Sequence, residues 1–388
     1  MGGKSLTGYE RALTVIQGGI PDRVPAYTPT MASDVAGRIL GRTAHTGGPA
    51  LWYAEAAAWC DGPAAWQEFD CQVTEDVIEL HRALEQDIIR FPWRNNIRPT
   101  ARVDDTTFVC GDLNGDHQIW RWDTDAMNFI DSRQPGRCRV EDWPELARQA
   151  EKGVEQRVAQ ARATFGAAEA RLQERLGRSM MVVASGAGLS LGLDEAHLVA
   201  AVLEPGAVEA ILECDLAVSV AQVEALSGRG IKVVLGGGDM ADKNGTIYSP
   251  EMFTRFMLPR WKRLAARCRD LGLHYVWRSD GNLWTIFDSL FRDAGFPGFG
   301  EADFDAAMTT ARVRARHPDL VIWANLSGDV LRRGVAEDAY RHSMAALQAS
   351  DGRRYFHGCS NTILPGTPPE NVMAMMKARD DFSRRETP

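Results

Sequence analysis

The predicted fold rests mainly on two stretches, Ser179-Met-Met-Val-Val-Ala-Ser-Gly-Ala-Gly188 and Ile231-Lys-Val-Val-Leu-Gly-Gly-Gly-Asp239. Each is a short apolar run that ends in glycines, which is typical of a buried strand leading into a ligand-facing turn. A helical pattern over residues 204–226 separates them. This order of strand, helix and strand predicts a parallel sheet whose neighbouring strands are connected by helices.

The same alternation extends over most of the chain. Apolar runs that read as strands are centred on Val24, Ile88, Val182, Val234, Val276, Phe299, Ile322 and Phe356. Helical patterns cover residues 5–18, 50–86, 143–176, 204–226, 249–272, 282–294, 336–349 and 369–382. Eight strands alternating with helices predict an α/β protein with a (β/α)8 TIM barrel. A doubly wound open sheet is the alternative, but its usual GxGxxG motif is missing from the first turn.

Residues 98–125 have a different pattern, in which apolar and polar residues alternate around Asn114-Gly115. Alternation around an Asn-Gly pair predicts a β-hairpin. The segment is too short to hold a core of its own, so we interpret it as an insertion in the barrel. The 388 residues would allow two or three domains. The strand count favours a single domain over 1–388, lengthened by an N-terminal helical extension and this hairpin.

Composition excludes several classes of protein. The chain has 44 basic and 52 acidic side chains, a net charge of −8, which argues against a nucleic-acid binder. Its seven cysteines are scattered and include no CxxC pair, which is typical of free thiols in a reducing compartment. The N-terminus lacks the apolar segment of a secretory signal, and no run of 18 apolar residues occurs. We therefore expect a cytoplasmic protein with no membrane partner.

The working face of such a barrel lies at the carboxyl ends of its strands. Polar residues at the predicted ends are Thr28, Thr30, Arg90, Trp93, Ser185, Asp239, Arg278, Asp280, Glu301, Asn325, His357, Cys359 and Asn361. Three of these, Asp239, Asp280 and Glu301, are carboxylates from adjacent strands. Such a group can bind a metal or another cation, or hold a raised pKa for acid–base chemistry. The alternative is an ion-pair network with Arg278 that only braces the barrel mouth.

Three other features are weaker signals. Gly236-Gly-Gly-Asp239 lacks the lysine of a phosphate-binding loop, so its glycines are better explained by close approach of a flat ligand. His357 and Cys359 stand two apart and could together ligate a metal, although an isolated pair of this kind is more often structural. Trp120 and Trp122 fall on one side of the hairpin and form either a packing patch or a lid over a planar ligand, with packing favoured.

Several motifs resemble the uroporphyrinogen decarboxylase superfamily. They are Tyr9-Glu-Arg with Pro21-Asp-Arg-Val-Pro, Ser249-Pro-Glu with its helix, Arg278-Ser-Asp-Gly-Asn282, and Ile363-Leu-Pro-Gly-Thr-Pro-Pro-Glu-Asn-Val372. The resemblance covers nearly the whole chain and implies a (β/α)8 barrel. One branch of this superfamily decarboxylates uroporphyrinogen. The other contains methyltransferases that pass methyl groups to or from a corrinoid cofactor, some of them with tetrahydrofolate or a thiol.

The chain departs from both branches at specific positions. The decarboxylases have an arginine pair after the first strand and a histidine before the Leu-Pro-Gly-Thr-Pro motif. Here residues 28–38 lack the pair, and Asn361 stands in place of the histidine. The thiol-activating methyltransferases bind zinc through His-x-Cys after the fifth strand and a cysteine after the eighth. Here Arg278 and Asp280 replace the first two, and Cys359 or Asn361 aligns with the third. Arginine does not ligate zinc, so we do not expect zinc.

A metal site rearranged around the carboxylates, His357 or Cys359 is the remaining metal alternative. With zinc disfavoured, the resemblance implies a methyltransferase component whose methylated substrate is an aryl methyl ether, a methylamine or a folate. Breaking the methyl–heteroatom bond requires protonation of the leaving atom. We expect Asp239 or Glu301 to supply that proton beside Asp280, and Arg278 to anchor a substrate carboxylate or a carboxylate neighbour. The expected ligand-binding residues are Trp93, Ser185, Trp277, Asn282, Asn325, His357 and Asn361.

The resemblance also implies partners. A corrinoid (cobalamin) would be held by a separate protein that docks on the barrel mouth, tetrahydrofolate is the candidate second cofactor, and a homodimer is the expected assembly. Two alternatives stay open. One is a decarboxylase-like lyase acting on a carboxylated substrate. The other is a non-catalytic barrel that binds a tetrapyrrole or a corrinoid.

Overall fold

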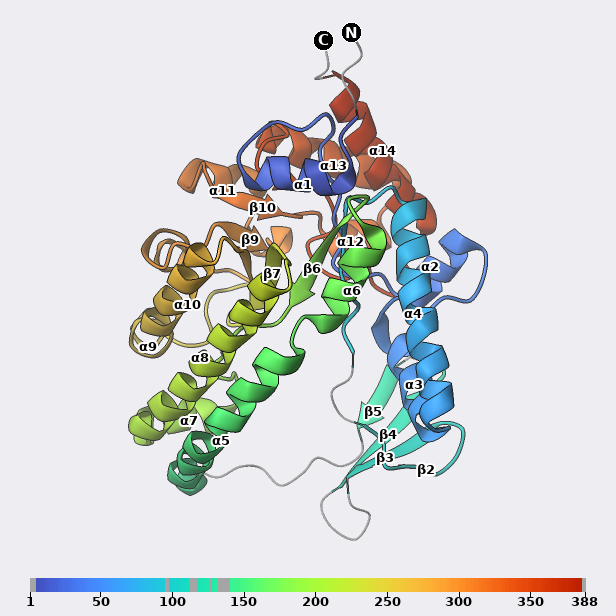
Figure 1. Cartoon of the computed structure of the whole chain (residues 1–388). Helices are drawn as coiled ribbons and strands as arrows, with labels where there is room; N and C mark the ends of the chain where they lie inside the picture. The colour runs from blue at the N-terminus through green and yellow to red at the C-terminus, as the bar shows by residue number, and fades with distance from the viewer. Residues whose placement is uncertain (1–4, 95–97, 112–116, 126–127, 132–139, 386–388) are drawn as a thin grey trace.

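The computed structural model describes residues 5–94, 98–111, 117–125, 128–131 and 140–385 (Figure 1). Its helices are α1 (Gly8–Ile16), α2 (Ser33–Leu40), α3 (Gly48–Cys60), α4 (Pro63–Ala83), α5 (Trp143–Thr164), α6 (Ala167–Leu176), α7 (Glu195–Leu203), α8 (Pro205–Gly228), α9 (Pro250–Met252), α10 (Leu258–Asp270), α11 (Thr310–Arg316), α12 (Gly328–Arg333), α13 (Ala336–Ser350) and α14 (Pro369–Arg385). No helix in these ranges is long and apolar enough to cross a bilayer.

A curled sheet of seven parallel strands forms the centre of the fold. Its strands, in spatial order, are β1 (Ile88–Ile89), β6 (Met181–Ser185), β7 (Val233–Gly237), β8 (His274–Arg278), β9 (Gly298–Gly300), β10 (Val321–Trp323) and β11 (Tyr355–Phe356). All seven coincide with predicted strands. The strand expected around Val24 is reduced to an isolated parallel bridge between Ala26 and His357. The carbonyl of Ala26 also accepts a hydrogen bond from Asp87 before β1, so this segment links the two edges of the sheet.

Side chains of the strands alternate between two cores. Val233, Leu235 and Val276 point inward and pack with Trp323 and Phe356, and α1 closes this inner core through Ala12 and Val15. The residues between them, such as Val234, Tyr275 and Trp277, pack outward against α8 and α10. The outer layer includes α5 beside α8 (Figure 1). This arrangement agrees with a TIM-like barrel.

Several predicted helices are interrupted by glycines with positive φ or by π-helical turns. The helix expected over 50–86 divides at Gly62, whose φ of +106° suits glycine, and Pro63 then begins α4. The one expected over 143–176 divides at Gly166, with φ of +76°. Residues Phe253–Met257 and Ser289–Asp293 form π-helical turns within the segments predicted as α-helix. The periodicity of apolar residues is the same in both cases, so it does not distinguish a π-helical turn from an α-helical one.

The predicted hairpin is part of a separate antiparallel sheet. It contains β2 (Ala101–Arg102), β3 (Thr107–Gly111), β4 (His117–Asp123) and β5 (Asn128–Asp131). The β3–β4 pairing confirms the hairpin, whereas Asn114-Gly115 lies outside the described residues. Trp120 and Trp122 are more than nine-tenths buried and contact Phe129, and Tyr53 of α3 contacts Trp122. The two tryptophans therefore form a packing patch, the favoured interpretation of their spacing.

Candidate functional site

A cavity of about 650 Å³ opens at the carboxyl ends of the parallel strands. This volume is in the usual range for small-molecule sites. Its walls come from the start of α3, the segment after β1, strand β5, the ends of β7–β9, helix α12 and the segment after β11. The lining residues are Thr30, Gly48, Pro49, Trp52, Trp93, Asn128, Asp239, Arg278, Asp280, Glu301, Arg332, Asn361, Thr362, Leu364 and Pro365.

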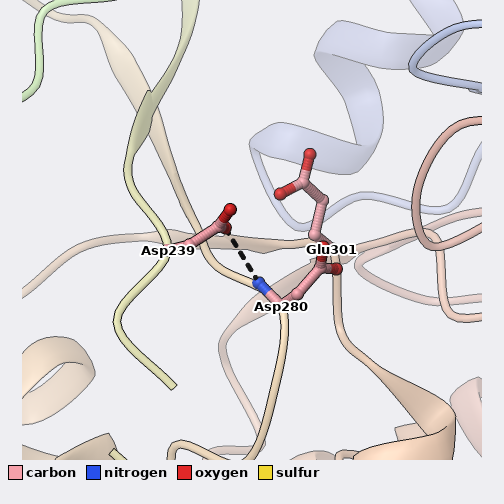
Figure 2. A group of neighbouring side chains, drawn as sticks. All are labelled: Asp239, Asp280 and Glu301. Atoms are coloured by element: carbon pink, nitrogen blue, oxygen red, sulfur yellow. Dashed lines mark hydrogen bonds between the residues drawn. The ribbon is translucent and has the colours of Figure 1, made fainter. Parts of the chain in front are cut away.

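Asp239, Asp280 and Glu301 meet in this cavity, and each carboxylate has an oxygen within 4.8 Å of the others (Figure 2). They follow β7, β8 and β9, so the parallel register brings them together as the sequence predicted. Asp239 is exposed, Asp280 is half-buried and Glu301 is buried. The backbone N–H of Asp280 lies 3.4 Å from Oδ1 of Asp239, so the first two carboxylates are neighbours through this contact as well.

Glu301 is held by an ion pair. Nη1 of Arg278 lies 3.1 and 3.0 Å from the two carboxylate oxygens of Glu301. Strand alternation would turn Glu301 outward after Gly300, but its φ of +56° breaks the alternation. Burial raises the Glu301 pKa, and Arg278 acts in the opposite direction. The charged partner therefore fixes where this carboxylate points.

A second arginine supports the floor of the cavity. Arg90 is buried and donates to Ser185 Oγ at 3.1 Å and to Thr30 Oγ1 at 3.0 Å. The guanidinium carbons of Arg90 and Arg278 lie 4.1 and 4.4 Å from the centroid of Trp93. These cation–π contacts hold the indole of Trp93 in place at the cavity wall.

Asp280 has the most informative electrostatics. Burial, followed by the charges of Glu301, Asp239 and Asp303, raises the pKa of Asp280 to about 7. The side-chain amide of Asn361 donates to its Oδ2 at 2.6 Å and acts in the opposite direction, because it stabilises the ionised form. A carboxylic acid that titrates near neutrality, next to an exposed carboxylate, can give or take a proton at the same place.

The structure also brings Trp93, Arg278 and Asn361 to the cavity, as predicted from the sequence. The ligand-binding prediction for Trp277 is wrong, because Trp277 is fully buried against Trp261 and Phe291 outside the sheet. Its neighbour Arg278 points inward, so alternation along β8 turns Trp277 to the opposite face.

Asn325 was also wrongly predicted to orient the ligand. It is buried, and it accepts from the N–H and the hydroxyl of Thr310 and donates to the carbonyls of Ala302 and Met308. All these bonds are at 2.6–3.0 Å, so the amide is used within the protein. Asn325 braces the segment after β9.

His357 and Cys359 do not reach the cavity either. Both are fully buried, and Nε2 of His357 lies 3.1 Å from the carbonyl oxygen of Met375. Burial lowers the His357 pKa to about 3 and raises the Cys359 pKa to about 12. A buried thiol in an apolar core is a poor metal ligand, so the structural interpretation of this pair holds.

Ser185 and Asn282 lie outside the cavity wall. Ser185 supports Arg90, and the side chain of Asn282 accepts from the N–H of Trp284 at 3.1 Å. Gly237 at the end of β7 makes room for the neighbouring backbone. A Cβ at Gly237 would lie 2.4 Å from the carbonyl oxygen of Arg278.

Sequence reasoning missed several wall residues. Trp52 belongs to α3, and its Nε1 donates to the carbonyl of Trp93 at 3.1 Å. Arg332 lies in α12 and is exposed, and Asn128 comes from β5. None of these three follows a parallel strand directly, so a search confined to strand ends does not find them.

The donors present do not match a zinc site. Of the cavity walls that the structure describes, none contributes a histidine or a cysteine. Only carboxylates converge, Glu301 is paired with Arg278, and Asp280 is bonded to Asn361. Zinc in proteins favours sulfur and imidazole ligands, so these residues do not fit that metal.

Comparisons with known proteins place this geometry in context. A family model described as uroporphyrinogen decarboxylase (URO-D) matches residues 183–382. No curated protein matches the chain significantly. A solved structure described as a methyltransferase from Methanosarcina mazei has a TM-score of 0.62 at 17% identity, over 97% of this chain and 99% of that one. A D-psicose 3-epimerase has a TM-score of 0.35 at 13% identity, over 59% and 86% of the respective chains, too low to support an argument.

The Methanosarcina structure shares the fold over nearly the full length of both chains. The family match covers more than half of the sequence and includes β7, β8 and β9, the strands that carry the three carboxylates. The chain belongs to the uroporphyrinogen decarboxylase (URO-D) family.

Proposed function

We propose that this protein is a methyltransferase component that moves a methyl group between a small methylated substrate and a corrinoid held by a partner protein. The observation that carries the proposal is the pair formed by Asp280, whose pKa is raised to about 7, and the neighbouring exposed carboxylate of Asp239. Methyl–oxygen and methyl–nitrogen bonds break more easily when the leaving heteroatom is protonated. An acid that keeps its proton near neutrality meets that need.

In this proposal the fold is a (β/α)8 TIM barrel in which the segment around Ala26 takes the place of the eighth strand. Helices α1–α4 are its N-terminal extension, and β2–β5 are an insertion that contributes Asn128 to the cavity wall. The cavity is then the space above the barrel core, bounded by the segments that follow the strands.

In this proposal the residues that line the cavity have different roles. Trp52 and Trp93 offer flat apolar surface to the substrate, and the leaving oxygen or nitrogen faces Asp280. Protonated Asp280 donates its proton to the heteroatom as the methyl group leaves. In the reverse direction the Asp280 carboxylate takes that proton back. The exposed carboxylate of Asp239 stabilises positive charge that develops on the heteroatom.

Glu301 and Arg278 have a positioning role here. We assign the acid to Asp280 rather than to Glu301, because Glu301 is buried and ion-paired with Arg278. The Arg278–Glu301 pair leaves the remaining two carboxylates to set the charge of the reacting centre.

The corrinoid, when it is bound to its partner, would accept or supply the methyl group. A corrin macrocycle is larger than an aryl methyl ether or a methylamine, so we place it across the mouth of the cavity and the substrate inside. The exposed apolar side chain of Leu364 at this rim is compatible with such a cover.

A decarboxylase-like lyase is the second candidate, favoured by the guanidinium of Arg332, which lines the cavity and would suit a substrate carboxylate. The chain lacks the arginine pair that the decarboxylase branch has after its first strand. A polyanionic substrate also fits poorly beside three carboxylates.

The decisive experiment mixes purified protein with cobalamin in its reduced or methylated form and an aryl methyl ether, a methylamine or tetrahydrofolate. Methyl transfer is followed by the cobalamin absorbance, and CO2 release from uroporphyrinogen is measured in parallel. We expect transfer with one of these substrates and a loss of about 100-fold or more in Asp280→Ala. Asp319→Asn is the control, because Asp319 is 91% exposed and precedes β10 at the opposite end of the strand.

Two outcomes contradict the proposal. CO2 release without methyl transfer supports the lyase, and tight cobalamin binding without turnover supports a non-catalytic carrier. An Asp280→Ala variant with normal transfer rates would remove the assigned acid while keeping the family activity.

A further inference from the structure

A second cavity, of about 460 Å³, lies away from the candidate site and shares no lining residue with it. Its walls are formed by α3, α4, α6 and the segment after β1. The lining residues are Glu55, Trp66, Asp70, Thr74, Phe91, Arg94, Arg98, Ala168, Arg171, Leu172 and Arg175. Four of them are arginines and two are carboxylates, in a chain whose overall charge is −8. The cavity is therefore a local basic region in an acidic protein.

The guanidinium groups are held in place before any ligand arrives. The guanidinium carbon of Arg98 lies 4.0 Å from the ring centroid of Trp66 and 4.3 Å from that of Trp59. Arg94 lies 5.2 Å from Trp66, and its Nε is 2.9 Å from the buried carboxylate of Glu55. Stacking and ion pairing of this kind reduce the conformational freedom that arginine would lose on binding.

Part of this positive charge is not neutralised. Glu55 is shared between Arg94 and Arg98, Asp70 also contacts Arg94 at 3.1 Å, and Arg175 pairs with Glu75 of α4. Nη2 of Arg94 is buried without a hydrogen-bond partner, and within the described ranges Arg171 forms no hydrogen bond or ion pair. Arg94, Arg98 and Arg175 pair with Glu55, Asp70 and Glu75, whereas Arg171 acts on Glu169 only through its charge.

We propose that this cavity binds a multivalent oxyanion, either free phosphate or diphosphate or the phosphate groups of a nucleotide. Guanidinium groups present paired N–H donors that match the oxygens of phosphate. The guanidiniums of Arg98 and Arg171, which line the cavity, would supply these donors. Trp93 of the candidate site directly precedes Arg94, so the two cavities are connected by one short segment of chain.

Binding is tested by isothermal titration calorimetry of the full-length protein at low ionic strength, with inorganic phosphate, pyrophosphate, ADP and citrate as probes. We expect pyrophosphate or ADP to bind, with affinity that falls as salt is added. Equal affinity for these two probes assigns the site to the diphosphate alone, and tighter binding of ADP assigns it to a nucleotide. A change in tryptophan fluorescence should accompany binding, because Trp59 and Trp66 contact Arg98.

Arg171→Gln should weaken binding about tenfold, since it removes a charge-assisted bond from an exposed helical position. Asp70→Asn should strengthen binding, because it removes a negative charge from the cavity wall. Arg148→Gln is the matched control on the exposed face of α5. Circular dichroism confirms that each variant is folded.

The inference is overturned if no phosphate probe binds the wild-type protein, if citrate alone binds, or if Arg171→Gln and Asp70→Asn both keep the wild-type affinity. None of these results depends on methyl transfer, so the outcome is independent of the proposed function.

Discussion

The protonation state of Asp280 decides what chemistry the cavity can perform. Its pKa is raised to about 7, first by burial and then by the negative charges of Glu301 and Asp239. If protonated Asp280 is the acid for demethylation, kcat/KM falls as the pH rises through about 7. A pH profile of substrate demethylation measures this limb. A rate that instead increases through pH 7 would assign Asp280 the role of a base.

Asn361 should influence the pH at which kcat/KM falls. Its amide donates to Oδ2 of Asp280 and so stabilises the ionised form. Asn361→Leu removes this donor, and the pKa of Asp280 rises further. The alkaline limb should then shift to higher pH by about half a unit or more, while Asn282→Leu, outside the cavity wall, leaves it unchanged. An unshifted limb in Asn361→Leu would mean that another group controls the rate.

The same raised pKa has a consequence for stability. The unfolded chain loses the Asp280 proton near pH 4, whereas the folded protein keeps it to about pH 7. Folded Asp280 therefore binds more protons over this interval, and its contribution to stability falls as the pH rises from 4 to 7. Asp280→Asn should raise the free energy of unfolding by about 1–3 kcal/mol at pH 8 relative to its effect at pH 4. Urea titrations at both pH values measure the difference, and an equal effect at both would contradict it.

The residues that sequence reasoning could place are those fixed by strand register. Asp239, Asp280 and Glu301 meet because their strands are parallel neighbours. Position at a strand end does not say which face a side chain takes or whether its bonds are already used. Trp277 was misplaced for the first reason and Asn325 for the second.

The side chain of Asn325 connects several segments of the fold. It bonds to Ala302 and Met308 after β9 and to Thr310 at the start of α11. Asn325→Leu would leave these buried backbone groups without partners, and we expect a loss of about 2–4 kcal/mol in the free energy of unfolding. Urea denaturation measures it against Asn244→Leu, at an exposed position. A loss below that of the control would contradict the bracing role.

The strands of the central sheet are predictable because each is a short apolar run bounded by turn residues. Other elements have a weaker signal in the sequence. Strand β5 has four residues and, among the residues that the structure describes, pairs with β4 alone, so its alternation is too short to recognise. The π-helical turns Phe253–Met257 and Ser289–Asp293 keep an apolar helical pattern while they change the winding.

The alternation of strands and helices along the chain predicts the barrel-like sheet without any sequence motif. How the two edges of this sheet are joined could not be predicted from the sequence in the same way. The segment around Ala26 contributes an isolated bridge to His357 and only one backbone–backbone bond to Asp87, whose side chain takes the N–H of Ala26. Pro25 lacks an N–H and limits the ladder. That a single domain spans the chain stays a prediction.

Exposed apolar side chains lie on the face around the cavity. Ile247 and Phe304 follow β7 and β9 and are 42% and 37% exposed, without lining the cavity. Apolar side chains on this face suit a partner protein that covers the mouth. Ile247→Glu should therefore reduce methyl transfer with a corrinoid protein about tenfold, because a charge would be buried at the interface, and leave transfer with free cobalamin unchanged. Ile20→Glu, at a 64% exposed position beyond α1, should affect neither rate. Equal rates for Ile247→Glu and wild type with the corrinoid protein would place the docking surface elsewhere.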